Sequence, residues 1–290
     1  MTGVLKFVET RLSELFEHFI VNTAPSILLM TGPPGTGKTV AVRMVAARHP
    51  EIRFVFYNPT ISGVPADALG HFELINSATF WVPGSIGEAL VQEGTVLVVD
   101  DAHLVAMHVS LFAGVGDESR TVTIPSTGEQ IQVANGVRLV ILANPPAADC
   151  PPWERYRYEI PEPIRDRARV IAIDGEFLSR EDELAIAATA WPADYPRSVL
   201  EGVVDVCRDL RKALPSPTYT PSPRSEVHLG SFLSQGLTLS DAFEQALCGK
   251  FLRAEEVVAA RAAFVAKFGA AAQSALVVDK EAAHVAAAVA

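Results

Sequence analysis

Cysteine is scarce in this chain of 290 residues. The three cysteines, Cys150, Cys207 and Cys248, are odd in number, widely spaced and free of any C-x-x-C arrangement. A disulfide framework uses an even number of cysteines, whereas a structural zinc site uses closely spaced ligands. The sequence therefore predicts reduced thiols, which are typical of a cytoplasmic protein.

The chain also lacks an excess of basic residues and any long apolar run. Its 24 Lys and Arg stand against 34 Asp and Glu, which gives a formal net charge of −10. Because nucleic-acid phosphates are bound mainly through Lys and Arg, this balance counts against a nucleic-acid partner. No stretch reaches the roughly 20 apolar residues that a membrane helix needs, and Glu9, Glu14 and Glu17 argue against a signal peptide in residues 1–22. We expect a cytoplasmic protein with no membrane segment.

The clearest motif is a phosphate-binding loop. The apolar run Ser26–Thr31 leads into the sequence GPPGTGKT at 32–39 and then into a segment of helical character. This order satisfies G-x-x-x-x-G-K-[ST] in the context that the pattern requires, which is a buried strand, a glycine-rich turn and a helix N-terminus. Gly35 and Gly37 permit left-handed backbone angles, so successive N–H groups and the positive end of the helix dipole can face one anion. A nucleoside triphosphate is therefore expected here.

The end of this loop carries two side chains with separate expected tasks. Lys38 can reach the β- and γ-phosphates, and the Thr39 hydroxyl is placed to ligate Mg²⁺. The predicted nucleotide contacts are Gly32, Pro33, Pro34, Gly35, Thr36, Gly37, Lys38, Thr39 and Val40.

Five apolar runs predict the strands of an α/β domain. Because helical segments alternate with these runs, the sheet should be mainly parallel. The proline-rich stretch 145–163 is expected to be irregular. The predicted strands are Ser26–Thr31, Ile52–Tyr57, Thr95–Val99, Arg138–Ala143 and Arg169–Ile173.

Further patterns precede and interrupt this sheet. Residues 3–22 have apolar side chains at helical spacing and a mixed to acidic polar face, which favours a helix packed on the core over one on a membrane surface. Residues 71–83 predict two short strands around 76–78, and residues 120–135 predict a hairpin with a Ser-Thr-Gly turn.

From Ser179 onward the periodicity is entirely helical. Ser179 and Asp182 resemble a capping box that opens the first of these helices. We therefore expect an α/β nucleotide-binding domain at 1–175 and a small all-helical domain at 176–290 that ends in an alanine-rich tail. Further helices are predicted at 197–213, 224–235, 240–248 and 251–268.

Two carboxylates follow the strand that ends at Val99. Ligands gather at the carboxyl ends of parallel strands, so Asp100 can hold the Mg²⁺ that Thr39 also contacts. Asp101 would then orient or activate the attacking water. The alternative is that one or both acids only cap the next helix. His103, just beyond them, is interpreted as a partly buried structural histidine rather than as a contact to a neighbour.

Polar side chains also follow the neighbouring strand and precede the last one. Asn144 could position water beside the γ-phosphate without adding negative charge, or it could be a turn residue before Pro145. Arg165, Arg167 and Arg169 could pair with surface acids, or one of them could cross a subunit interface to stabilise γ-phosphate charge. Spacing alone favours the surface interpretation.

The order of these motifs resembles an AAA+ ATPase, and within that superfamily the MoxR and NirQ/NorQ/CbbQ group. Agreement in order across several motifs is more specific than any single motif. The resemblance spans residues 5–250 and is carried by GPPGTGKT (32–39, Walker A), LGHFEL…FWVPGSIGEALVQEG (69–94), VLVVDD (96–101, Walker B), RTVTIPSTGEQIQVANGVRLVILANP (120–145), IPEPIRDRARVIAIDG (160–175) and PSPRSEVHL (221–229).

The resemblance implies roles for individual residues. Asn144 takes the sensor-1 position, Arg167 the arginine-finger position, and Arg224 the sensor-2 position at the start of a lid helix. Two positions differ from the family pattern. Asp101 stands where glutamate is usual, and Ala168 stands where phenylalanine usually follows the finger, so Arg165 remains an alternative finger.

The resemblance also implies an activity and partners. It implies a chaperone-like ring, a hexamer, that hydrolyses Mg-ATP to ADP and phosphate while it remodels or activates a partner protein. In this group the partner often has a von Willebrand factor A-type domain. Two alternatives stay open, an ATP-gated scaffold ring with negligible hydrolysis and a nucleic-acid-associated NTPase motor.

Overall fold

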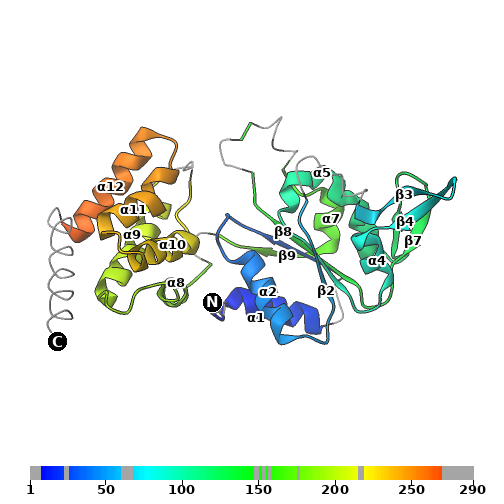
Figure 1. Ribbon diagram of the computed structural model, residues 1–290, viewed down its shortest axis with the longest axis horizontal. Helices are drawn as coiled ribbons and strands as arrows, with labels where there is room; N and C mark the ends of the chain where they lie inside the picture. The colour runs from blue at the N-terminus through cyan, green and yellow to red at the C-terminus, as the bar shows by residue number, and fades with distance from the viewer. Residues whose placement is uncertain are drawn as a thin grey trace. The chain divides into compact units, whose positions relative to one another are not determined.

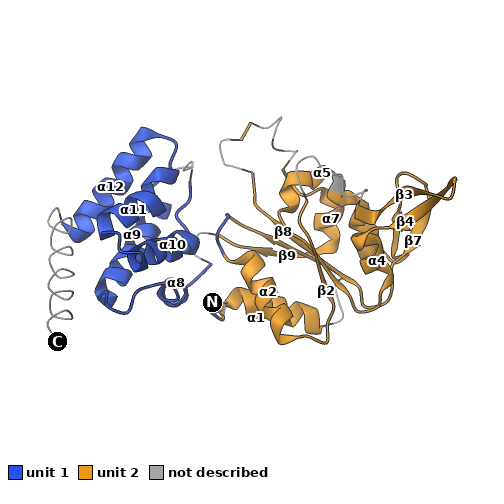
Figure 2. Cartoon of the chain, viewed as in Figure 1, with its two compact units in different colours: residues 1–8, 34–36, 175–290 blue, residues 9–33, 37–174 orange. Residues whose placement is uncertain are grey.

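The computed structural model describes residues 8–22, 26–59, 68–146, 150–151, 155, 158–174, 177–214 and 219–269. The chain divides into two compact units (Figure 2), one of residues 9–33 and 37–174 and the other of residues 1–8, 34–36 and 175–290. The first unit contains the sheet, and the described part of the second is helical. The first residues of the expected leading helix and the alanine-rich tail lie outside the described residues.

A parallel five-stranded sheet forms the centre of the first unit, as the sequence predicts. Its strand order is β2-β5-β8-β1-β9, so β1, which leads into the phosphate loop, is paired on both sides. β5 and β8 are buried at nearly every position, which explains why they appear in the sequence as continuous apolar runs. The strands are β1 (Ile27–Thr31), β2 (Phe54–Tyr57), β5 (Val96–Val99), β8 (Arg138–Ala143) and β9 (Ala168–Ala172).

Helices cover both faces of this sheet (Figure 1). α1 (Arg11–Val21) and α2 (Lys38–Arg48) lie on one face. The other face packs against α4 (Ser85–Val91), the 3-10 helices η1 (Ala102–Val105) and η2 (Ser110–Gly116), and α5 (Ala106–Val109) and α7 (Glu162–Arg167). Leu29, Leu97, Leu139 and Ile141 point into the core on this second face.

Two elements differ from their predicted extents. α1 begins at Arg11 and not near residue 3, because Thr10 and Ser13 make reciprocal capping bonds: the Thr10 N–H donates to Ser13 Oγ over 3.0 Å, and the Ser13 hydroxyl donates to the Thr10 carbonyl over 2.7 Å. α7 occupies part of the stretch expected to be irregular. Its Pro163 stands in the first turn, where a missing N–H costs no helical hydrogen bond.

Two hairpins extend from the sheet, as the sequence predicts. β3 (Gly70–Ile75) and β4 (Ala78–Pro83) pair across Asn76 and Ser77, both of which have positive φ as a tight hairpin turn requires. β6 (Thr121–Thr123) and β7 (Gln130–Gln132) form the second hairpin.

The second unit packs its helices around an apolar core that includes Phe243 and Phe264, whose ring centroids lie 4.5 Å apart. The predicted capping box is present, because Ser179 Oγ accepts from the Asp182 N–H over 3.0 Å. The described residues include no helix with the length and apolar character needed to cross a membrane. The helices are α8 (Arg180–Ala188), α9 (Arg197–Ala213), α10 (Pro223–Ser234), α11 (Leu239–Ala246), the 3-10 helix η3 (Cys248–Lys250) and α12 (Ala254–Phe268).

Candidate nucleotide-binding site

The loop between β1 and α2 has the backbone that its glycines predict. Gly35 has φ +80° and Gly37 has φ +87°, both in the left-handed region where a side chain is strained. Gly37 also stands directly before α2, so the free N–H groups of the first turn open onto this loop. Such an arrangement of N–H groups and helix dipole attracts a phosphate.

The start of the loop is fixed to both neighbouring strands. The Gly32 N–H donates to the Ala143 carbonyl of β8 over 3.2 Å, and the Ile173 N–H beyond β9 donates to the Thr31 carbonyl over 2.7 Å. A Cβ on Gly32 would lie 2.6 Å from both the Cβ and the carbonyl oxygen of Ile173. Gly32 is therefore needed for close packing, and the motif alone did not identify Ile173 as the residue that requires it.

Lys38 connects the loop to the next strand. Its Nζ donates to the carbonyls of Gly32 and Pro33 over 2.7 and 2.9 Å and to Asn144 Oδ1 over 2.9 Å. The Lys38 side chain is buried, and these three oxygens surround its charge. Lys38 and Asn144 are 106 residues apart in the sequence, yet β1 and β8 are adjacent, which brings them together.

Thr39 and Asp100 form the second pair that the fold brings together. The Thr39 hydroxyl lies 2.9 Å from Asp100 Oδ2 and 3.1 Å from Oδ1. The Asp101 N–H also donates to Asp100 Oδ1 over 3.0 Å, which orients the carboxylate. A hydroxyl and a carboxylate side by side are the oxygen ligands that Mg²⁺ prefers, so these residues fit that ion.

Asp101 stands in an unusual backbone conformation. Its φ is +49° and its ψ is +35°, in the left-handed region that non-glycine residues rarely adopt. It precedes η1, but its side chain makes no capping hydrogen bond there. Among the described residues, no hydrogen bond therefore supports the alternative that Asp101 only caps the next helix.

His103 lies against Asn144. Its Nδ1 is 3.3 Å from the Asn144 backbone nitrogen, and its Nε2 is 3.5 Å from Asn144 Nδ2. Burial lowers the pKa of His103; the negative charge of Asp101 opposes this shift, and the positive charge of Lys38 adds to it. Sequence patterns could not predict this contact, because a hairpin separates β5 from β8 along the chain.

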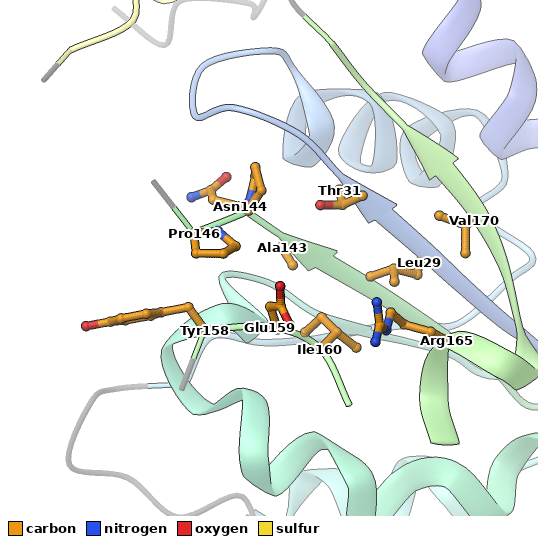
Figure 3. Close-up of a pocket in the computed structure, with 11 residues that line it drawn as sticks. Leu29, Thr31, Ala143, Asn144, Pro146, Tyr158, Glu159, Ile160, Arg165 and Val170 are labelled. Atoms are coloured by element: carbon orange, nitrogen blue, oxygen red, sulfur yellow. The ribbon is translucent and has the colours of Figure 1, made fainter. Parts of the chain in front are cut away.

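The two candidate finger arginines lie in different surroundings. Arg167, at the end of α7, forms an ion pair with Asp117 through Nε and donates from Nη1 to the Pro163 carbonyl over 2.8 Å. Arg165 instead lines a cavity of about 280 Å³ at the carboxyl ends of β1 and β8. Figure 3 shows Thr31 and Asn144 at one end of this cavity and Arg165 at the other.

Arg224 belongs to the helical unit and follows Pro223 at the start of α10. Its expected reach to the phosphates stays a prediction. The structure thus brings together Lys38, Thr39, Asp100 and Asn144 through hydrogen bonds, with Asp101 beside them.

Comparison with known proteins agrees with this geometry. Residues 27–168 match the family described as AAA domain (dynein-related subfamily). The chain is 28% identical over 244 residues to Protein NorQ of Paracoccus denitrificans (strain Pd 1222), which covers 80% of this chain and 82% of that protein.

Two solved structures are also similar. A mutant of RuvB from Thermotoga maritima superposes with a TM-score of 0.46 at 13% identity, and the match covers 86% of this chain and 66% of that one. A putative ATPase from Cytophaga hutchinsonii superposes with a TM-score of 0.44 at 15% identity, and the match covers 87% and 80% of the two chains.

Proposed function

We propose that this AAA+ ATPase of the MoxR/NorQ type binds Mg-ATP at the loop 32–39 and that rings of the protein use ATP hydrolysis to remodel a partner protein. The observation that carries the nucleotide site is the pair of contacts Lys38–Asn144 and Thr39–Asp100. They join three distant segments at one edge of the sheet, where ligands of α/β proteins bind.

Lys38 and the loop hold the phosphates. The Lys38 ammonium now rests on two loop carbonyls and Asn144, and a phosphate oxygen offers it a stronger, charged acceptor. The loop contacts are those of residues 32–40, with backbone N–H groups as donors. Thr39 and Asp100 hold the Mg²⁺, which when bound neutralises charge on the phosphate oxygens.

Asp101 and Asn144 act on the attacking water. Asp101 accepts its proton, while the uncharged Asn144 amide orients it beside the γ-phosphate. Asp101 reaches one methylene less far than glutamate would, and its left-handed backbone directs the side chain differently from an ordinary helix cap. This conformation supports a role for the carboxylate in the site.

The ring supplies the remaining charge. Arg167, or Arg165 as the alternative, acts as the finger on the nucleotide of a neighbouring subunit, and Arg224 contacts the phosphates of its own subunit. We propose a cytoplasmic hexamer that acts as a chaperone on a partner protein, with a von Willebrand factor A-type domain as the partner class. Arg167 pairs with Asp117, which is the acid pairing that spacing alone favoured, so its assignment as the finger rests on the resemblance.

The experiment compares nucleotide binding and turnover in Arg167→Ala. ATP binding should be unchanged, since no Arg167 contact lies within the loop, while hydrolysis should fall by about 10³-fold, as when a finger is removed. Arg197→Ala is the matched control, because Arg197 is an exposed arginine that pairs with Glu201 on α9. Normal hydrolysis by Arg167→Ala would show that the finger is another residue, and Arg165→Ala would be measured next.

A further inference from the structure

His103 occupies a position that the nucleotide contacts leave unexplained. It lies in η1, three residues after Asp100, and is partly buried at the edge where β5 and β8 end. The Asn144 backbone N–H donates to His103 Nδ1 over 3.3 Å, with the hydrogen directed at the ring nitrogen. The histidine therefore accepts a hydrogen bond from the Asn144 backbone, whereas Lys38 bonds the Asn144 side chain.

This contact defines the protonation state of the ring. A nitrogen that accepts a hydrogen bond carries no proton, so the single proton of the neutral imidazole is on Nε2. In the protonated ring, the Nδ1–H would face the Asn144 N–H. Two donors cannot share a hydrogen bond, so protonation breaks this one. Bond formation thus requires neutral His103.

Burial and the charge of Lys38 favour a neutral ring, against the charges of two carboxylates. Asp100 and Asp101 from the end of β5 and Lys38 from α2 are the charged groups that face it, and Asn144 from β8 is the polar one. Burial is the largest influence and lowers the pKa of His103, so the ring is neutral at physiological pH.

Asn144 is held at two points. Its Oδ1 accepts from Lys38 Nζ over 2.9 Å, and its backbone N–H donates to His103 Nδ1 over 3.3 Å. Its Nδ2 lies 3.5 Å from the protonated Nε2, and because both groups are donors this contact is not a hydrogen bond. An exchange of the amide O and N would set two donors, Nζ and Nδ2, against each other. The backbone bond to Nδ1 then fixes the end of β8 relative to η1.

We propose that His103 is a positioning residue for hydrolysis, which holds Asn144 in register with the Walker B acids through its neutral Nδ1. The inference rests on the proposed role of Asn144. His103 contacts neither water nor phosphate in this account and acts only through Asn144. It joins the end of β5, with Asp100 and Asp101, to the end of β8.

Three variants test this role in the full-length protein with ATP. His103→Leu removes the acceptor and should lower kcat about tenfold, as expected for the loss of one neutral hydrogen bond, with KM for ATP and nucleotide affinity within about twofold of wild type. His103→Asn keeps an acceptor near the Nδ1 position and should restore most of kcat. His71→Asn is the control, because His71 is exposed on the β3–β4 hairpin.

The pH profile separates positioning from general structural support. Wild-type kcat should fall as His103 becomes protonated, below its ordinary pKa of about 6.5. His103→Asn should lack this acid loss, since its acceptor does not titrate. An unchanged acid limb in His103→Asn, or wild-type kcat in a folded His103→Leu, overturns the proposal.

Asn144→Ala distinguishes this inference from the role on which it rests. If Asn144→Ala hydrolyses ATP normally, the assignment of Asn144 is wrong and the inference falls with it. If Asn144→Ala is impaired while His103→Leu is not, only the positioning role is wrong. Thermal melting of each variant shows whether it is folded.

Discussion

At the scale of single residues, Lys38 shows how the site is held ready for a ligand. A buried ammonium is costly unless it is paired, and here three neutral oxygens solvate it. A phosphate oxygen would offer this ammonium a charged acceptor, which binds it more strongly than a neutral one. The sequence predicted the residue and its task from the motif alone. It could not predict Asn144 as its partner, because that contact depends on strand order.

Asp101 gives the sharpest residue-scale prediction. Asp101→Asn keeps the left-handed backbone at little cost, since asparagine adopts that conformation more readily than most residues. It removes the charge that accepts the proton of the water, so kcat should fall by about 10²-fold or more while nucleotide affinity is retained. Phosphate release and binding of a fluorescent ATP analogue measure the two quantities.

Phosphate release by the wild type also tests the alternative of an ATP-gated scaffold, which would have negligible hydrolysis. Unchanged phosphate release in Asp101→Asn would mean that another group activates the water. Glu88→Gln is a control for loss of one acidic charge, because Glu88 lies in the first turn of α4 and outside the site.

At the scale of elements, buried strands were the best-predicted part of the chain. Arg138–Ala143 was predicted with the bounds it has, because its apolar side chains are buried from Leu139 to Ala143. α7 was missed, because the four prolines at 151, 152, 161 and 163 suggested an irregular stretch, whereas Pro163 lies in the first turn of the helix. The pairing of Arg167 with Asp117 was likewise out of reach, because no spacing rule relates a helix to a turn 50 residues away.

The contact between α1 and α2 should depend on pH. His49, just after α2, lies 2.9 Å from Glu17 of α1 and 2.8 Å from Glu51. The hydrogen bond to Glu17, followed by that to Glu51, raises the pKa of His49 above its ordinary value of 6.5. A raised pKa in the folded state adds stability that is fully present below about pH 6.5 and is lost as pH rises through the folded value.

Thermal melting of wild type and His49→Asn at two pH values checks this. The wild type should have a higher melting temperature than His49→Asn near pH 6, and this difference should be smaller at about pH 8. A difference that is equal at both pH values would mean that the charged form of His49 does not hold α1 to α2.

The helical unit contains a buried charge cluster with a clear asymmetry. Glu183 of α8 is 1% exposed. It accepts hydrogen bonds from two arginines of α9, from Arg208 over 2.6 Å and from Arg211. Glu226 of α10 is fully buried beside Glu183. Burial, followed by the charge of Glu183, raises the pKa of Glu226 well above its usual range. Glu226 is therefore held in its neutral form.

Substitutions at the two acids should have opposite consequences. Glu183→Ala removes the buried carboxylate that pairs with Arg208 and Arg211 and should cost about 3–5 kcal/mol of unfolding free energy. Glu226→Gln replaces a neutral acid by a neutral amide of the same shape and should leave stability unchanged or raise it. Urea denaturation followed by circular dichroism measures both. A loss in Glu226→Gln as large as that in Glu183→Ala would show that Glu226 is ionised.

At the scale of the whole molecule, the sequence predicted the family, because its motifs lie in a fixed order along the chain. Walker A, Walker B and Asn144 follow three strands that the fold sets side by side in the order β5-β8-β1. The three motifs meet because these strands are neighbours in the sheet, and the order of the motifs along the chain reflects the order in which these strands are connected. Arg167 and Arg165 are assigned by the resemblance, and a role between subunits depends on an assembly that one chain does not form, so their roles are proposals.

That assembly can be tested by mixing two variants that are each inactive for a different reason. Asp101→Asn keeps Arg167 but lacks the carboxylate of its own site, whereas Arg167→Ala keeps its own site but offers no finger. If the finger acts on the neighbour, an Arg167→Ala subunit beside an Asp101→Asn subunit has a complete site. In randomly mixed rings of equal parts, about a quarter of all sites are complete, because ring interfaces are head-to-tail.

The mixture should therefore hydrolyse ATP well above the sum of its separate components. A matched control mixes Arg167→Ala with the double variant Asp101→Asn/Arg167→Ala, which has no finger to donate and should restore nothing. Recovery in the first mixture alone assigns Arg167 to the neighbouring subunit's nucleotide. If neither mixture recovers although both form rings, Arg167 does not complete the nucleotide site of the neighbouring subunit.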